Sequence, residues 1–331
     1  MDLFVGSRSI PGSYGKSPKS YLLENNGAGT FSDVTTEKAP ELRRLGMITD
    51  ATWADVYGEK KKELVIVGEW MPATVFRNLN DRLKNITDEV GLDKTNGFWK
   101  TVYADDIDND NDSDLVAGNL GTNSIFRVSD KKPLELFIND FNGDGTTDPI
   151  IAEHRKDNLY TWARRDELLD QIPGLKERIP TYDAYSDMTI DDIFSERKMH
   201  NSVRRKVNTL KSMYFENGEG KFNAYSLPEK SQLSPIQSMI SYRFSNGGSR
   251  DILTGGNFFG SDNKQGRYDA GYGLLLSSEG RGSFKTVPVE RSGFVIRGEV
   301  RDIHMVKGNN LDPIIMVARN DDSLQFYKST H

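Results

Sequence analysis

The sequence predicts an all-β fold, a β-propeller of six to seven blades built from four-stranded antiparallel sheets. Three observations favour it: a strand motif recurs, a glycine hairpin motif recurs, and two acidic loops each lead into a copy of the strand motif. In the strand motif, an acidic residue precedes a short apolar run. Six copies occupy residues 2–6, 63–68, 114–118, 148–152, 251–255 and 312–317. Apart from one longer gap, they are roughly 35 to 60 residues apart, near the length of a propeller blade.

The second repeated motif is a strand followed by Gly-x-Gly and a phenylalanine. It occurs at residues 21–31, 213–222 and 274–284. Glycine readily adopts the left-handed conformation that tight hairpin turns require, so each copy predicts a β-hairpin. These glycines do not indicate a dinucleotide-binding loop, because a strand residue such as Phe31 follows them instead of a helix.

The longest gap between copies of the strand motif contains a helical pattern. Between residues 162 and 201, apolar residues recur at helical spacing among many charges, and Pro173 and Pro180 limit the length of each helix. We expect a single propeller domain over residues 1–331, with a helical insertion at 162–201 inside one blade. Five basic residues form either a basic patch or a solvated face balanced by adjacent acids. They are Arg164, Arg165, Arg204, Arg205 and Lys206.

Two acidic loops have the spacing of calcium ligands. Calcium prefers six to eight oxygen ligands, and oxygens at positions 1, 3, 5 and 9 of a tight turn can surround it. Asn111 and Gly145 occupy position 6, where a positive φ is tolerated. The sequence therefore predicts Ca²⁺ as a cofactor at two sites. The ligands are Asp106, Asp108, Asp110 and Asp114 in the first loop, and Asp140, Asn142, Asp144 and Asp148 in the second.

Other interpretations of these loops stay open. Asp, Asn and Gly also form ordinary surface turns that bind no ion. An EF-hand is disfavoured, because position 12 would be Ala117 or Ile151 instead of a bidentate glutamate. The first site is predicted to bind more tightly, because Asn142 replaces a charged ligand in the second. We expect a structural role, in which the ion offsets carboxylate repulsion and fixes the link between two strands.

These loops, strands and hairpins resemble the FG-GAP and VCBS repeat family of β-propellers, which includes the integrin α-subunit propeller and bacterial surface proteins similar to cartilage acidic protein. The resemblance covers nearly the whole chain, and segments 118–123 and 266–273 look like larger bacterial members of the group. It implies an extracellular, periplasmic or outer-membrane surface location and an adhesive or ligand-binding role. It implies no catalytic reaction.

The turns after the second strand of each unit are predicted to open on the face opposite the calcium loops. Around a propeller axis they would form a funnel of amides, guanidinium groups and aromatic rings, suited to a glycan or to a peptide with acidic groups. The alternative is that they cap the blades and bond neighbouring backbone. The candidate ligand-binding residues are Arg8, Trp70, Asn119, His154, Asn257, Arg267 and Arg319.

Composition and charge restrict the function further. A net charge of −6 argues against nucleic acid as a partner, and the absence of cysteine excludes thiolate metal sites. We predict an exported adhesion module that binds a glycan or a surface protein, without a recognised catalytic constellation. Two alternatives stay open: a carbohydrate-active enzyme that uses Glu69, Glu153 or Asp269, and a structural spacer. Facing carboxylates would favour the enzyme, whereas acids paired with arginines would favour binding.

The location of the protein is predicted indirectly. No apolar run approaches the roughly 18 residues that span a bilayer, so direct membrane insertion is not expected. The first residues also lack the basic start and apolar stretch of a signal peptide. Residues 2–6 match the second strand of a unit whose first strand is missing. We therefore expect a longer protein, with a signal or a lipid anchor upstream of Met1.

Overall fold

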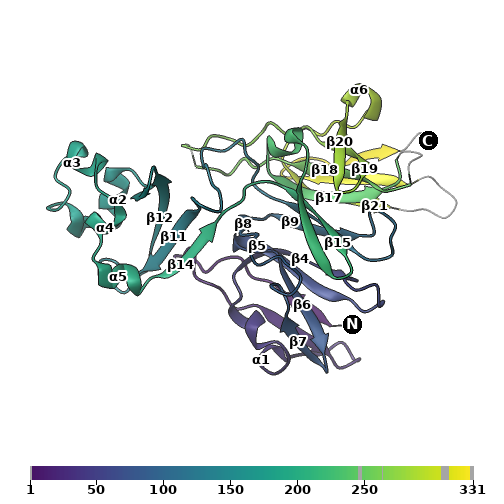
Figure 1. Cartoon of the computed structure of the whole chain (residues 1–331), viewed down its shortest axis with the longest axis horizontal. Helices are drawn as coiled ribbons and strands as arrows, with labels where there is room; N and C mark the ends of the chain where they lie inside the picture. The colour runs from purple at the N-terminus through teal and green to yellow at the C-terminus, as the bar shows by residue number, and fades with distance from the viewer. Residues whose placement is uncertain (1, 245–247, 263, 307–312, 329–331) are drawn as a thin grey trace.

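The computed structural model describes residues 2–244, 248–262, 264–306 and 313–328 (Figure 1). Within these ranges the fold is all-β, with antiparallel sheets and only short helices. Several of the sheets have four strands, so the predicted class and the predicted four-stranded antiparallel sheets are confirmed. None of the described helices is long and apolar enough to cross a membrane.

The first third of the chain forms two sheets. Sheet I contains β1 (Leu3–Val5), β2 (Tyr21–Asn25) and β3 (Phe31–Asp33). Sheet II contains β4 (Met47–Ala54), β5 (Glu63–Met71), β6 (Thr74–Leu79), β7 (Arg82–Asn85) and β8 (Gly97–Phe98). Helix α1 (Thr35–Lys38) and a 3-10 turn (Pro40–Arg44) connect the two sheets.

Three further sheets continue the main body. Sheet III contains β9 (Thr101–Asp105), β10 (Asp114–Gly118), β15 (Met213–Gly218) and β16 (Lys221–Ser226). Sheet IV contains β17 (Ile236–Tyr242), β18 (Asp251–Gly256), β19 (Leu274–Gly280) and β20 (Ser283–Val287). Helix α6 (Val289–Ser292) leads to sheet V, which contains β21 (Val300–Val306), β22 (Ile314–Arg319) and β23 (Gln325–Lys328).

Between β10 and β15 the chain leaves sheet III and forms a separate sheet, which we call the inserted sheet. Its strands are β11 (Leu134–Asn139), β12 (Asp148–Arg155), β13 (Asn158–Thr161) and β14 (Val203–Val207). Four helices join β13 to β14: α2 (Arg165–Gln171), α3 (Tyr182–Ser186), α4 (Ile190–Ile193) and α5 (Glu196–His200). The helices lie within the predicted range 162–201, but the excursion begins after β10 and includes a whole sheet that projects from the main body (Figure 1).

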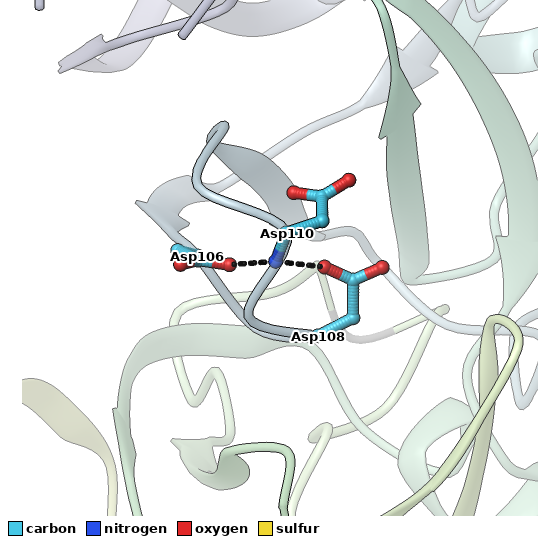
Figure 2. Close-up of side chains that lie close together, drawn as sticks. All are labelled: Asp106, Asp108 and Asp110. Atoms are coloured by element: carbon cyan, nitrogen blue, oxygen red, sulfur yellow. Dashed lines mark hydrogen bonds between the residues drawn. The ribbon is translucent and has the colours of Figure 1, made fainter.

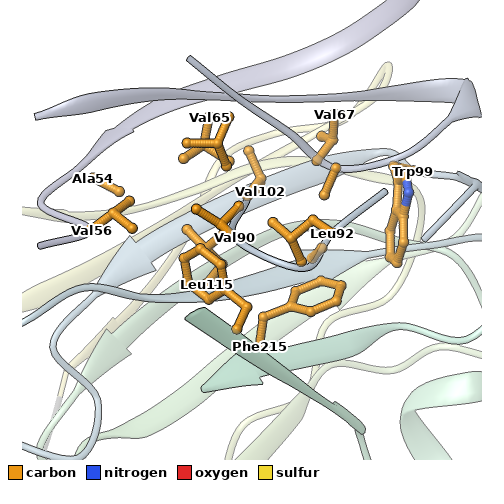
Figure 3. Close-up of a cluster of buried hydrophobic side chains, with 14 of the residues drawn as sticks. Ala54, Val56, Val65, Val67, Val90, Leu92, Trp99, Val102, Leu115 and Phe215 are labelled. Carbon is orange, nitrogen blue, oxygen red and sulfur yellow. The ribbon is translucent and has the colours of Figure 1, made fainter. Parts of the chain in front are cut away.

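Buried apolar clusters join successive sheets. Figure 3 shows the cluster between sheets II and III, in which Val65 and Val67 of β5 lie near Leu115 of β10 and Phe215 of β15. The first strands of sheets II to V, which are β4, β9, β17 and β21, contact one another in that order. Within the described part of the chain the sheets do not close into a ring, so the predicted six or seven propeller blades are not confirmed.

The acidic residue at the start of the strand motif has a structural role. In four sheets its carboxylate is buried and accepts a hydrogen bond from the backbone N–H seven residues earlier, which closes the preceding loop. The pairs are Glu63 with Val56, Asp114 with Ile107, Asp148 with Phe141, and Asp251 with Phe244. This shared bond explains why the motif recurs. Asp312, the last predicted copy, lies outside the described residues, as does Met1.

Candidate functional site

The first acidic loop, between β9 and β10, brings three carboxylates together. One oxygen from each of Asp106, Asp108 and Asp110 lies within 4.8 Å of the others (Figure 2). The backbone N–H of Asp110 donates to Asp106 Oδ1 at 3.0 Å and to Asp108 Oδ1 at 3.3 Å. Asn109 and Asn111 have φ values of 68° and 77°, a conformation that asparagine tolerates better than most residues. The turn therefore aims several oxygens at one small volume.

The electrostatics of this loop fit a cation. Burial is the main reason that the pKa of Asp112 rises to about 7, and the nearby Asp110 carboxylate is the second reason. Burial also raises the pKa of Asp114 to about 7. Asp112 Oδ1 is buried and has no hydrogen-bond partner among the described residues. Asp114 has a different role, because its carboxylate accepts hydrogen bonds from the backbone N–H groups of Ile107, at 3.1 Å, and Asn217, at 2.8 Å. An unsatisfied oxygen and crowded carboxylates are the donor set that Ca²⁺ would satisfy.

A pH test follows from these values. Without calcium, the protein should lose stability as pH rises from about 4 to about 7, because the folded state holds protons on Asp112 and Asp114 that the unfolded chain has released. Thermal denaturation in chelator at several pH values measures the loss. Asp112→Asn should make the fall shallower, and excess calcium should do the same. Identical slopes in wild type and Asp112→Asn would contradict the assignment.

The second acidic loop, between β11 and β12, holds its side chains through internal hydrogen bonds. Asp140 Oδ1 accepts the N–H of Gly143 at 2.6 Å, and Asn142 Nδ2 donates to Asp144 Oδ2 at 2.9 Å. Hydrogen bonds from Thr146 hold the pKa of Asp144 below its usual value. Among the described residues, the carboxylates of this loop do not gather as those of the first loop do. A calcium site at Asp140, Asn142, Asp144 and Asp148 stays a prediction.

Two candidate ligand residues are buried amides that hold turns together. Asn119 Oδ1 accepts the N–H groups of Phe98 and Leu120, and its Nδ2 donates to the carbonyls of Thr209 and Lys211. Asn119 is 0% exposed and Asn257 is 2% exposed. Such enclosed amides match the alternative that these turns cap the sheets.

Asn257→Ala should lower the free energy of unfolding by about 3 kcal/mol, because buried partners lose their hydrogen bonds. Asn257 Oδ1 accepts from Ser234 Oγ at 2.7 Å and from the Gly271 N–H at 2.8 Å, while Nδ2 donates to the carbonyls of Gly271 and Gly298, each at 2.8 Å. Urea denaturation measures the change. Asn78→Ala, at an exposed position, is the control. A loss below about 0.5 kcal/mol would contradict this role.

Each of the three candidate arginines contacts a different group of the protein. Arg8 pairs with the buried Glu69 at 2.9 Å. The Arg267 guanidinium lies 3.9 Å from the centre of the Phe259 ring. Arg319 pairs with Asp322 at 2.6 Å and also donates to backbone carbonyls. Each side chain therefore has a partner within the protein.

Trp70 and His154 are the two candidates that line one cleft, a space of about 760 Å³ beside β14. Trp70 is only 2% exposed, because its ring packs edge-on against Phe98 and its Nε1 donates to Tyr14 Oη at 2.8 Å. We call this space the basic cleft. Its walls come from sheet II and its flanks, the segment before β11, and the inserted sheet: Leu45, Trp70, Met71, Pro72, Asn96, Lys131, Pro133, Glu135, His154, Arg204, Arg205 and Lys206.

Positive charge dominates the basic cleft. Its single carboxylate, Glu135, is almost fully buried and pairs with Arg204 and with His154 Nε2 at 3.2 Å. Arg205 donates to the Gly15 carbonyl at 2.8 Å, and burial lowers its pKa. Lys131 and Lys206 are exposed, and neither ammonium group has an ion-pair partner in the described part of the chain. The cleft therefore has two lysine ammonium groups that are free to bind a ligand, beside a buried glutamate whose charge is already neutralised.

Sequence reasoning found part of this cleft. The basic run on β14 was expected as one of two alternatives, but Lys131 and Glu135 were not predicted as neighbours. The structure also divides the expected patch: Arg204, Arg205 and Lys206 line the basic cleft, whereas Arg164 and Arg165 lie at the start of α2. The three consecutive basic residues of β14 were the available signal, whereas the pairing of Glu135 with Lys206 in register is visible only in the structure.

Comparisons with known proteins do not assign a family. No family model matches the chain, and no curated protein matches it. Among solved structures, the chain is similar to an Agrocybe aegerita lectin described as recognising non-reducing terminal N-acetylglucosamine, at 13% sequence identity, over 98% of this chain and 92% of that chain. The TM-score is 0.20, too low to transfer that fold or that ligand to this chain.

Proposed function

We propose that this chain is a calcium-stabilised binding module that recognises an acidic glycan in the basic cleft. The observation that supports it is the local charge: four lysine and arginine side chains line the cleft against Glu135, which is already paired. The whole chain carries a net charge of −6, so this cleft differs in sign from the chain as a whole. Carboxylate or sulfate groups on a ligand would complement it.

The walls of the cleft favour a glycan over other anions. Leu45, Met71 and Pro72 supply apolar surface beside the cations. The C–H faces of sugar rings can pack on such surface while acidic substituents reach Lys131 and Lys206. An acidic segment of a surface protein is the alternative ligand, and it makes the same charge contacts without needing the apolar wall.

In this proposal Ca²⁺ stabilises the first acidic loop. Asp106, Asp108 and Asp110 would hold the ion, and the orphan oxygen of Asp112 lies in the same loop. The ion would supply positive charge that cancels carboxylate repulsion and joins β9 to β10. The second loop is proposed as a weaker site, because its side chains already satisfy one another.

The proposal includes a propeller relationship between sheets I to V. The adjacency of β4, β9, β17 and β21 supports it, because the first strands of propeller blades lie together around an axis. We also propose an exported location. An exported location would suit a structural calcium site, because calcium sites in extracellular modules commonly bind at about 10⁻⁴ to 10⁻³ M.

Binding is favoured over catalysis because two of the three candidate acids, Glu69 and Glu153, are paired with cations, although Asp269 has no ion pair within the described ranges. Glu69 contacts Arg8 at 2.9 Å and Lys100 at 2.6 Å, and Glu153 contacts Arg155 at 2.8 Å. A carboxylate held by a cation is a poor general acid, because the cation stabilises its ionised form. For Glu69 and Glu153 this pairing is the arrangement expected of a binding site.

The proposal is tested by calorimetric titration of the whole chain with hyaluronate, a soluble carboxylated polysaccharide, at low and high salt. We expect binding that weakens as salt rises, because exposed charge contacts are screened. Poly-glutamate is titrated in parallel. Absence of hyaluronate binding at low salt, or tighter binding of poly-glutamate, would overturn the glycan assignment.

A further inference from the structure

A second cleft lies wholly within the inserted segment and has aromatic walls. It has a volume of about 380 Å³, and it is bordered by β13, the residues that follow β13, and helix α3. Its aromatic side chains are Tyr160, Trp162, Tyr182 and Tyr185. It shares no lining residue with the basic cleft. We call it the aromatic cleft.

The aromatic walls are held in place by polar contacts. Tyr185 Oη donates to the Ala163 carbonyl at 2.5 Å and is also hydrogen-bonded to Thr161 Oγ1. Tyr182 Oη donates to Asp166, and the Arg165 guanidinium lies 5.5 Å from the centre of the Tyr182 ring. A ligand would therefore meet preformed walls and would not have to order them. Yet Tyr182 is 57% exposed, which leaves a large aromatic surface in water.

The charges around the aromatic cleft are balanced. Arg155 pairs with Glu153 at 2.8 Å. Arg165 pairs with Asp166 at 3.0 Å and also donates to the Ile179 carbonyl. These pairs leave little net charge to attract an ionic ligand.

Two polar side chains line the aromatic cleft without a strong internal ion pair. The carboxylate of Asp183 has no hydrogen-bond or ion-pair partner within the described ranges, and the charge of Arg164 acts on the nearby Glu167 and Tyr182. One is a planar donor and the other a planar acceptor of opposite charge. Together they can bond a neutral group that both donates and accepts hydrogen bonds, such as a pair of adjacent hydroxyls.

We infer that the aromatic cleft binds a neutral sugar ring. The C–H face of a pyranose would pack on the exposed Tyr182 ring, and its hydroxyls would bond Arg164 and Asp183. A phosphorylated or sulfated ligand fits less well, because the cations other than Arg164 are already neutralised. The inference extends the proposed function to a second site, but it stands on different residues.

Saturation-transfer NMR and calorimetry with methyl glucoside, methyl galactoside and methyl mannoside test this inference on the whole chain. We expect at least one of them to bind, and Tyr182→Ala to weaken that binding about tenfold, since truncation of an anchoring aromatic residue commonly has such an effect. Tyr182→Phe should bind like the wild type, because the ring face is retained.

Tyr272→Ala is the matched control, because Tyr272 is 58% exposed and lies outside both clefts. It should bind like the wild type. Wild-type binding by Tyr182→Ala, or no binding of any of the three glycosides, would overturn the inference. Removal of cations from the basic cleft should leave binding of these neutral glycosides unchanged, so the two proposals can fail separately.

Discussion

Asp108→Ala is expected to remove most of the stabilisation that calcium gives to this protein. Asp108 is one of three carboxylates whose oxygens lie within 4.8 Å of one another, so its loss takes one ligand from a site that has few alternatives. With calcium one hundredfold above the dissociation constant, bound ion stabilises the folded state by about 2.7 kcal/mol. Thermal denaturation of wild type and variant, in calcium and in chelator, measures the difference.

The controls separate the loss of a ligand from general destabilisation. In chelator the variant should melt close to wild type, because without the ion removal of Asp108 relieves repulsion from Asp106 and Asp110. Asp144→Ala should show a smaller calcium-dependent loss, in keeping with a weaker second site. Asp157→Ala, at an exposed turn, should show none. An equal loss for Asp108→Ala in calcium and in chelator would contradict a metal at the first loop.

The double variant Lys131→Ala/Lys206→Ala should weaken hyaluronate binding about tenfold at low salt. Each exposed charge contact contributes up to about 1 kcal/mol, and about 1.4 kcal/mol corresponds to a factor of ten in affinity. The same variant should show a weaker dependence of affinity on salt, because fewer charges remain to be screened. Calorimetric titration at two salt concentrations measures both quantities.

These two lysines are the appropriate choice because their ammonium groups have no ion-pair partner in the described ranges. Arg204 and Arg205 would be ambiguous, since one pairs with the buried Glu135 and the other bonds the Gly15 carbonyl. Lys62→Ala/Lys221→Ala removes the same charge from surfaces outside the basic cleft and should leave affinity nearly unchanged. If both double variants weaken binding equally, the cleft is not the binding site.

The sequence by itself determined the local structure, because the forces involved act within a few residues. The hairpin motif predicts turns that need a left-handed backbone, and Gly27, Gly29, Gly220 and Gly282 all have positive φ at the tips of antiparallel hairpins. The acidic strand motif is equally local, because its carboxylate bonds the backbone seven residues earlier. Spacing alone does not decide the clustering of carboxylates, because the second acidic loop has the same spacing and only the first loop gathers its carboxylates within the described residues.

Only the tertiary structure decided which surfaces are open. Trp70 and Asn257 carry polar or aromatic groups that suit a ligand, but sheet packing buries both, and burial depends on segments distant in the chain. The basic cleft likewise requires β14 to return beside β11 after four helices, which places Lys206 opposite Glu135. Sequence spacing carries little information about such pairings, because they depend on which apolar faces bury one another once the whole chain has folded.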